Sequence, residues 1–582
     1  MLKSIWKSSI PIMIALILVF NIVSCGVSTI DNQPDGTEIE TTGETVEKTS
    51  VSVETTEESS TSDAEQAAFQ DGPLVPYPET ITITWGVAAS AVDEFFDGDT
   101  YENNRWTRRF LEDLNINLEV AFSADAGTGS SGSSAYDERL RTMLVSGDLP
   151  DIFHSYDRLF FQEAHKAGYL MDLGPLLEQY GTDSVKQYSN DYLDSFEGGK
   201  IDGVQYGYPV MGDNFNTAHY IWIRDDWLEN TNTQPPETVN EFIELARKFT
   251  FGNPNGDGSK TYGFAMTNSV VDNMVALLGA YGVPSAWGGI YYRGKDDKIT
   301  NSLLQPEVKD VLGILRDMYN EGIIDPEFIV KDGAALESDI TQNIVGMFDY
   351  RYWGNWYPYN FSYESEGVIT RPYPIPKIEN IDYKLGVSNN AGGMLQFLNA
   401  NCKHPEAFIK ILNLHNVVCN EYTDPHEYEY FISSHQDAFI PVRALIPTEH
   451  YAYMVHEALE KGSGDDLPLA VRPYYDYTVN FENKTDTSPP AYGTWGQMYE
   501  RGSLKIAYEY INDGAFVEDI MGAQIPNAAL ENGEILKTMT NAAFTDIIVG
   551  DKPVDSFDFY IQDWLANGGQ EILDDLEIFY PK

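Results

Sequence analysis

The sequence predicts an α/β protein with more than one lobe, and three observations support this class. First, 582 residues exceed what one hydrophobic core normally serves, so two or more lobes are expected. Second, residues 81–86 (ITITWG) and 116–122 (INLEVAF) alternate as strands around an amphipathic helix at 105–114, and this βαβ order indicates a parallel sheet. Third, residues 203–249 have the pattern of a crossing from one sheet to another.

This crossing starts with a short strand at 204–209, which ends in a proline and leads into polar residues at 213–216. An apolar, β-prone run at 218–223 predicts the next strand. Behind a double proline, Thr238 and Glu241 form a capping box, which indicates the start of a helix. The chain therefore leaves one set of strands and enters another within this stretch.

Helices and strands continue to alternate along the chain. A helix around 140–144 is followed by SGDLPDIF at 146–153, in which Gly147 suits a left-handed helix cap and Pro150 forces an extended entry into a strand. Further helices are expected at 308–318, 405–412 and 557–564, and a second crossing at 387–393.

These sequence segments resemble, in content and order, those of the family-1 extracellular solute-binding proteins of ABC importers. The resemblance rests on the 203–249 crossing with its RDDWL, on SGDLPDI, and on NEGIIDPEF at 320–328, and it spans about residues 81–580. It implies a two-lobed periplasmic-binding-protein-like fold (type II) with a hinge, an interlobe ligand cleft and a helical C-terminal part. The chain is most similar to the Gram-positive lipoprotein branch that serves carbohydrate importers.

The resemblance also implies lobe boundaries and a motion. The first lobe is expected to comprise residues 76–210 and 390–435, and the second lobe residues 211–389 and 436–582 with the C-terminal helices. Hinge closure about the crossings is the expected motion.

The N-terminus has the features of a lipoprotein signal peptide over residues 1–25. Two lysines precede an apolar segment that is too short for a membrane span and ends in IVSC at Cys25. This ending resembles the lipobox of bacterial lipoproteins, in which the cysteine becomes the lipidated N-terminus; ordinary cleavage beside an incidental cysteine is the alternative. Residues 26–75, rich in Ser, Thr and Glu, are expected to be a disordered linker. The protein would then be lipid-anchored on the extracellular face of the cell membrane.

The net charge of -53 argues against two classes of partner. A polyanion is repelled by nucleic acid and by anionic membrane surfaces, so we expect neither as a partner. The same acid surplus favours a neutral or weakly charged ligand. We expect a monomer.

No enzyme is predicted, because the sequence has no GxSxG, HExxH, P-loop or metal-like Cys/His spacing. One alternative is a secreted polysaccharide-active enzyme, since two of the 90 acidic residues could form a catalytic carboxylate pair. A surface adhesion module is a second alternative.

The remaining two cysteines, Cys402 and Cys419, flank a predicted helix. A continuous helix would hold them about 20 Å apart, too far for a disulfide. We therefore expect two buried free thiols.

A loop after the first crossing makes calcium a candidate cofactor. Asn253, Asn255 and Asp257 in GNPNGDG resemble the first half of an EF-hand-like calcium loop. However, Asn253 stands where the first Asp is usual, and the twelfth position is Phe264, which offers no carboxylate. A glycine-rich β-turn is the favoured interpretation.

Aromatic residues in loops predict a carbohydrate-binding cleft. Flat rings suit the C–H faces of sugars, and Asp, Asn and Arg suit the hydroxyls; core packing at a lobe interface is the alternative for each ring. The implied function is capture of an oligosaccharide for ABC permease subunits, with peptide as the rival ligand. The predicted ligand-binding residues are Trp85, Tyr208, Asp213, Trp287, Arg351, Trp353, Trp356 and Trp495.

Overall fold

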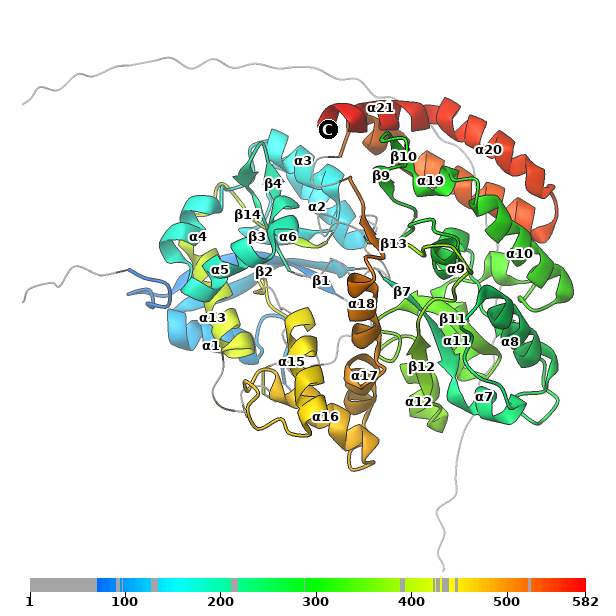
Figure 1. Ribbon diagram of the computed structural model, residues 1–582. Coiled ribbons are helices and arrows are strands. Elements are labelled where there is room, and N and C mark those ends of the chain that lie inside the picture. The colour runs from blue at the N-terminus through cyan, green and yellow to red at the C-terminus, as the bar shows by residue number, and fades with distance from the viewer. Residues whose placement is uncertain are drawn as a thin grey trace, which may run out of the picture. The chain divides into compact units, whose positions relative to one another are not determined.

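The computed structural model describes residues 71–581, apart from gaps at 90–94, 97, 127–133, 211–217, 287, 388–392, 422–423, 425, 427–429, 432–438, 445–447 and 522–524. Cys25, the signal peptide and nearly all of the predicted linker lie outside the described residues. Two separate sheets, each covered by helices, confirm the mixed α/β class (Figure 1). Among the described residues, no helix is both long and apolar enough to cross a bilayer.

The first sheet has the strand order β2-β1-β3-β14-β6. The strand β1 runs parallel to β2 and β3, whereas β14 is antiparallel to both β3 and β6. The bounds are β1 (Ile81–Ala89), β2 (Ile116–Asp125), β3 (Ile152–Ser155), β6 (Gly207–Pro209) and β14 (Leu395–Leu398), with a small hairpin of β4 (Lys200–Ile201) and β5 (Val204–Gln205).

Helices of the first lobe start and end where the sequence indicates. Asn104 caps α1 (Arg105–Leu114) by accepting from the amides of Trp106 and Thr107, and Gly147 ends α2 (Ala135–Ser146) with a φ of 81°. The remaining helices of this lobe are α3 (Arg158–Lys166), α4 (Gly174–Tyr180), α5 (Asp183–Asp191), α6 (Leu193–Glu197) and α13 (Glu406–Asn420). Cys402 precedes α13 and Cys419 lies in its last turn; both are buried and neither forms a disulfide, as predicted.

The second sheet has the order β12-β7-β11-β8, with β7 antiparallel to both of its neighbours. Its strands are β7 (His219–Arg224), β8 (Tyr262–Phe264), β11 (Val345–Arg351) and β12 (Thr370–Tyr373). The predicted capping box of Thr238 and Glu241 starts α8 (Val239–Phe251). The other helices are α7 (Asp225–Thr231), α9 (Val275–Ala280), α10 (Val308–Glu321), α11 (Gly333–Thr341) and α12 (Asn360–Glu366), beside a hairpin of β9 (Tyr291–Arg293) and β10 (Ile299–Asn301).

The chain passes between the sheets where predicted. It leaves the first sheet at Pro209 and enters the second at His219. It then returns: β13 (Leu385–Val387) is followed by β14, which is back in the first sheet. Residues 211–217 and 388–392 of these crossings lie outside the described part.

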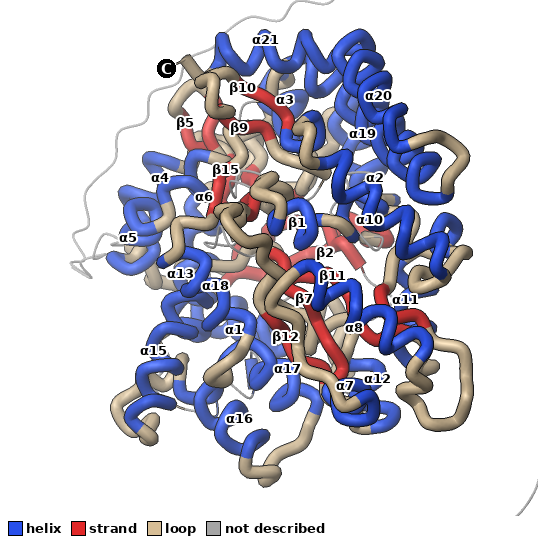
Figure 2. Tube along the Cα trace, turned by 45° about the vertical axis from the view of Figure 1, so that its right-hand side comes forward, coloured by secondary structure: helices blue, strands red, loops and turns tan. Residues whose placement is uncertain are grey.

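The C-terminal part is helical and packs with the second sheet. Helices α15 (Thr448–Lys461), α16 (Arg472–Glu482), α17 (Pro489–Met498) and α18 (Ser503–Asn512) gather at one end, and α19 (Asn527–Val549), α20 (Phe557–Trp564) and α21 (Gln570–Phe579) at the other (Figures 1 and 2). Between them, β15 (Phe516–Glu518) pairs with β13.

Two predictions about this part need correction. Ile440, Val442 and Ala444 pack in the core of the first sheet, so the first lobe extends beyond the expected boundary at 435, because these apolar side chains face α13 and β1. Trp495 lies within α17 and not in a loop, since Ser488 caps that helix and its two prolines occupy the first helical turn, where proline is tolerated.

Candidate ligand-binding site

The two crossings determine which ends of the sheets carry the candidate site. In the first sheet, Leu395 at the start of β14 pairs with Ser155 and Pro209, the last residues of β3 and β6. In the second sheet, His219 at the start of β7 pairs with Arg351 at the end of β11. Side chains on these two edges therefore flank the crossings, which is where ligands of open α/β sheets collect.

At the first edge lies a cavity of about 140 Å³, which we call the first-lobe pocket. Its walls come from β1, β3 and β14, from Tyr101 before α1, and from the segment before α15. The lining residues are Trp85, Val87, Ala88, Tyr101, His154, Met394, Gln396, Phe439, Ile440, Pro441 and Arg443.

A buried glutamine fixes the segment that carries Arg443. The Gln396 side chain is 1% exposed; its amide donates to the Arg443 carbonyl at 2.9 Å, and its oxygen accepts from the Arg443 backbone N–H at 2.6 Å. Nearby, Asn104 donates to the Phe439 carbonyl at 3.2 Å. Both ends of the segment 439–443 are thus hydrogen-bonded to the first lobe, and the Arg443 side chain lines the pocket.

His154 contributes a neutral ring to the same pocket. It stacks on Tyr136 with ring centroids 5.0 Å apart. Burial lowers the pKa of His154 to about 4, and the nearby charge of Arg443 acts in the same direction. Positive charge in the first-lobe pocket at neutral pH therefore comes from Arg443.

Trp85 forms another wall, and its ring is almost wholly buried. The residue is 2% exposed, yet its indole Nε1 donates no hydrogen bond to any residue in the described part of the chain. Leaving such a donor unpaired costs about 1–3 kcal/mol. Trp85 is thus a core residue whose buried indole N–H has no partner among the described residues.

The second edge carries four aromatic residues and one arginine from β11 and the turn after it. We call this group the second-lobe ring cluster: Tyr350, Arg351, Tyr352, Trp353 and Trp356. The Arg351 guanidinium lies 5.3 Å from the ring centroid of Trp353 and 5.8 Å from that of Tyr350. Trp353 meets Tyr352 edge to face at 5.0 Å. Trp353 and Trp356 are both partly exposed.

Trp356 differs from Trp353 in how it is supported. It packs on α17, where a Cβ atom at Gly493 would lie 2.5 Å from the ring. A glycine is therefore required there for close approach of the ring, and one face of Trp356 is covered by the helix. Trp353 packs at the margin of the second-lobe core.

Charges at the second edge are balanced by neighbours. His219 Nδ1 lies 2.7 Å from Asp349 Oδ1, and the second oxygen of Asp349 accepts from the Ala276 amide at 2.7 Å. Arg351 faces Asp272 and Asp349, while burial lowers its pKa. Burial raises the pKa of Asp272, and Arg351 and His219 oppose that shift.

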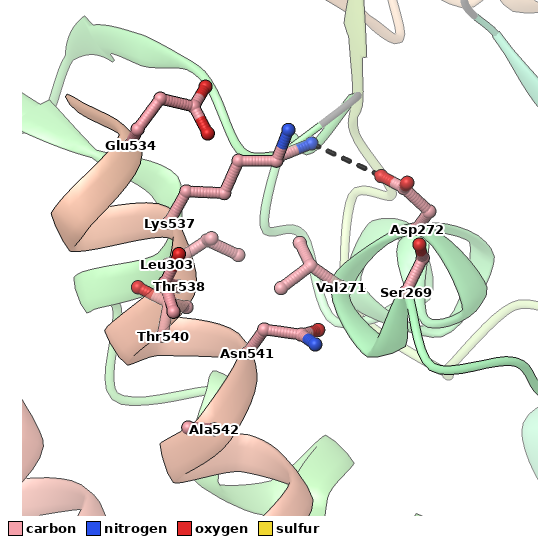
Figure 3. Close-up of a pocket in the computed structure, with 11 residues that line it drawn as sticks. Ser269, Val271, Asp272, Leu303, Glu534, Lys537, Thr538, Thr540, Asn541 and Ala542 are labelled. Atoms are coloured by element: carbon pink, nitrogen blue, oxygen red, sulfur yellow. Dashed lines mark hydrogen bonds between the residues drawn. The ribbon is translucent and has the colours of Figure 1, made fainter. Parts of the chain in front are cut away.

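A cavity of about 350 Å³ lies between the segment at Asp272 and α19 (Figure 3). The Gly288 amide donates to Asp272 at 3.3 Å, and Lys537 extends from α19 toward the same carboxylate (Figure 3). No feature of the sequence indicated this cavity, because its walls come from segments far apart in the chain. It is lined by Ser269, Val271, Asp272, Gly288, Leu303, Glu534, Lys537, Thr538, Thr540, Asn541 and Ala542.

Two predicted ligand-binding residues lie in hydrophobic cores instead. Tyr208 is 0% exposed and packs edge to face on Phe196 in the first-lobe core. Trp495 is 2% exposed, stacks on Tyr499 at 4.5 Å, and carries the Arg371 guanidinium 4.7 Å from its ring. Trp495 lines a different cavity, at the far end of β12, and we assign both residues to packing.

The other predicted residues divide between the two edges and the undescribed part. Trp85 lies at the first edge, and Arg351, Trp353 and Trp356 lie at the second. Asp213 and Trp287 lie outside the described residues. Sequence reasoning did not identify His154, Gln396 or Arg443.

The calcium-like loop folds as a hydrogen-bonded turn. Asn253 accepts from the Gly258 amide at 2.8 Å, and Asp257 accepts from the Ser259 amide at 2.8 Å. The Asn255 side chain accepts from Trp227 Nε1 and donates to the Asn343 carbonyl, each at 2.9 Å. One carboxylate and two engaged amides do not make a calcium-ligand set. Among the described residues, no cluster of three His, Cys, Asp or Glu side chains could hold a metal ion.

Two α/β lobes, a chain that crosses between them, and polar and aromatic edges at the crossings define a periplasmic-binding-protein-like fold. A family model described as bacterial extracellular solute-binding protein matches residues 115–414, just over half of the chain. The chain belongs to this family.

Individual relatives extend this similarity to most of the chain. The polygalacturonan/rhamnogalacturonan-binding protein YtcQ of Bacillus subtilis (strain 168) is 22% identical over 478 residues, covering 80% of this chain and 85% of YtcQ. Lipoprotein LipO of the same organism is 26% identical over 220 residues, covering 37% and 41% of the two chains. The structure of the Streptococcus pneumoniae substrate-binding protein FusA in complex with kestose superposes with a TM-score of 0.61 at 14% identity, covering 86% of this chain and 99% of FusA.

Proposed function

We propose that this solute-binding protein captures an oligosaccharide between its two sheet edges and delivers it to the permease subunits of an ABC importer. The observation that carries the proposal is the partly exposed Trp353, held beside Arg351 at the edge where the chain crosses between lobes. An exposed ring next to a charged donor is suited to a sugar, which offers a C–H face and hydroxyls. The relatives named above support a saccharide over a peptide, since YtcQ is named for pectic polymers and FusA was solved with kestose.

The test is a thermal-shift screen of the purified protein against oligosaccharides and peptides. A ligand that binds only the folded protein raises its stability by RT ln(1 + [L]/Kd), about 2.7 kcal/mol at a concentration of 100 Kd. We expect stabilisation by at least one oligosaccharide, including galacturonate oligomers and kestose in the panel, and none by peptides. Stabilisation by peptides alone, or release of reducing ends from a polysaccharide, contradicts the proposal.

The proposal includes a lipid anchor at Cys25. It is supported by the IVSC ending of the apolar N-terminal segment and by the relative that is itself a lipoprotein. Several acyl chains on one residue anchor a protein stably where one chain does not. The Cys25→Ala protein should therefore appear in the medium or as unprocessed precursor, as measured by fractionation and intact mass. Membrane retention of this variant at the wild-type mass contradicts the anchor.

A further inference from the structure

The first-lobe pocket contains hydrogen-bond donors that the protein does not use. The Arg443 guanidinium makes no hydrogen bond or ion pair with any residue, within the part of the chain that the structure describes. The Trp85 indole N–H, buried in the wall of the same pocket, is also without a partner there. Both groups can only donate, and of the two the partly exposed Arg443 guanidinium is the one that a ligand in the pocket can reach.

Among the described residues, no acidic side chain lines this pocket, although the protein has 90 acidic residues. The charged groups that reach His154 are Arg443 and, from α2, Asp137. Asp137 is engaged at the start of its own helix, where it accepts from the backbone and hydroxyl of Ser134. The positive charge at the pocket therefore has no carboxylate bonded to it within the described part of the chain.

Other shielded arginines of this protein have hydrogen-bond acceptors or carboxylates near their guanidinium groups. The Arg224 guanidinium bonds both oxygens of Asp226, at 3.0 and 2.6 Å. The Arg158 guanidinium donates to the carbonyls of Gly198 and Gly393, at 3.1 and 2.8 Å. Arg351 faces two carboxylates at the opposite edge. Arg443 departs from this pattern, and the Gln396 bonds hold its backbone beside the pocket.

A half-buried cation with no counter-charge is disfavoured unless something binds to it, because its desolvation is not offset. The planar guanidinium matches a carboxylate with two parallel hydrogen bonds. We propose that the first-lobe pocket binds the carboxylate of a uronic acid unit, so that the oligosaccharide is acidic. This inference rests on the proposed function and replaces the expectation of a neutral ligand drawn from net charge.

The dimensions of the pocket agree with one acidic sugar unit that enters in part. A volume of about 140 Å³ is that of roughly four or five water molecules, enough for a carboxylate and part of a ring. Arg443 takes the carboxylate, while the neutral His154 ring bonds an adjacent oxygen. Val87, Met394 and Ile440 supply an apolar wall for the C–H face of the sugar.

The experiment is calorimetric titration of the purified full-length protein with trigalacturonic acid and with galactotriose. These sugars differ at C6, where one has a carboxylate and the other a hydroxymethyl group. We expect the acidic sugar to bind about tenfold or more tightly, and this preference to shrink as NaCl rises from 50 to 500 mM. Arg443→Gln should remove the preference, a loss of about ten- to 150-fold in affinity for the acidic sugar.

Arg316→Gln is the matched control, because Arg316 is similarly half-exposed and bonds a single carbonyl, that of Lys552. It should bind both sugars like the wild type. Equal affinity of the wild-type protein for the two sugars overturns the inference. This comparison needs no variant, so it remains a test even if Arg443→Gln misfolds. Tighter binding of an acidic tripeptide also overturns it. If galactotriose binds and the acid does not, the inference fails and the proposed function stands; if no saccharide binds, the proposed function fails as well.

Discussion

The first-lobe pocket and the second-lobe ring cluster differ in how their charges are satisfied. In the first, Arg443 and the Trp85 N–H have no partner among the described residues, and the surrounding ring of His154 is neutral. In the second, Arg351 faces Asp272 and Asp349 and lies over aromatic rings. Under the proposed function this difference implies a division of roles: the first lobe would recognise the charge of the ligand, and the second would offer a surface on which sugar rings stack.

The largest expected effect of a single change concerns the support of Arg443. Gln396→Ala leaves a buried N–H and C=O of Arg443 without partners, which should lower the free energy of unfolding by about 2–5 kcal/mol. It should also reduce the preference for trigalacturonic acid, because the guanidinium is no longer held at the pocket. Chemical denaturation and calorimetry measure the two effects. Gln187→Ala, on the exposed side of α5, is the control and should change neither; an unaltered Gln396→Ala protein would show that the segment is held by other contacts.

Trp356→Ala should mainly lower stability. One face of the ring packs on Gly493, so its loss leaves a gap between α17 and the turn after β11. We expect about 2–3 kcal/mol, less than the roughly 3–5 kcal/mol of a fully buried tryptophan, since the ring is partly exposed. Urea denaturation tests this expectation. A wild-type unfolding midpoint combined with weak saccharide binding would instead place Trp356 in the site.

Trp353→Ala should mainly weaken saccharide binding, in contrast to Trp356→Ala. Loss of a stacking ring should cost about 1–3 kcal/mol of binding, or five- to 150-fold in affinity, by analogy with base stacking. The melting temperature of the free protein should change little, because this ring lies at the margin of the core. Trp353→Phe keeps a stacking surface and should retain most of the affinity. If Trp353→Ala binds saccharide normally, the second lobe contributes no stacking surface at this position.

Much of the fold could be predicted from local patterns. The capping box of Thr238 and Glu241, the glycine that ends α2 and the strands around α1 are all determined within a few residues of sequence. The return of the chain to the first sheet also follows from the order of elements. Trp495 was misassigned because glycines suggested a loop, whereas in α17 they let Asn355 and Trp356 approach the helix.

The candidate site was predictable only in part. Tryptophans after a strand end point to a ligand edge, and Trp353 lies at one. Gln396 and Arg443 are separated by 47 residues, and their contact arises from tertiary folding, so no local pattern indicates it. Net charge likewise gives no information on Arg443, because the surroundings of a single cation are set by its neighbours in space.

Acid should affect the first-lobe core through its neutral histidines. Burial lowers the pKa of His415 to about 3, where its Nδ1 accepts from the Ala444 amide at 3.0 Å. A depressed histidine pKa means that the unfolded chain binds the proton first, so stability falls as pH drops below about 6.5. Between pH 7 and pH 5 each such group should remove about 2 kcal/mol. His415→Gln should flatten this part of the pH profile, whereas His165→Gln, at a half-exposed position, should not; equal slopes in both variants would contradict the assignment.

The smallest effect expected is that of calcium. Because the side chains of Asn253, Asn255 and Asp257 bond within their own turn or to its neighbours, chelation with EDTA should leave the melting temperature unchanged. Thermal shift with EDTA and with added Ca²⁺ measures this, and Asp257→Asn is the companion variant. Stabilisation by millimolar Ca²⁺ that this variant abolishes would show that the loop rearranges to bind the ion.

The most direct test of the account is a double-mutant cycle of Arg443→Gln and Trp353→Ala, read by calorimetric titration with trigalacturonic acid. If one ligand bridges the two edges, each single variant should weaken binding. The double variant should lose the sum of the two effects to within about 0.5 kcal/mol, because the residues belong to different lobes and would contact different parts of the ligand. Wild-type affinity in either single variant would show that the ligand does not bridge the first-lobe pocket and the second-lobe ring cluster.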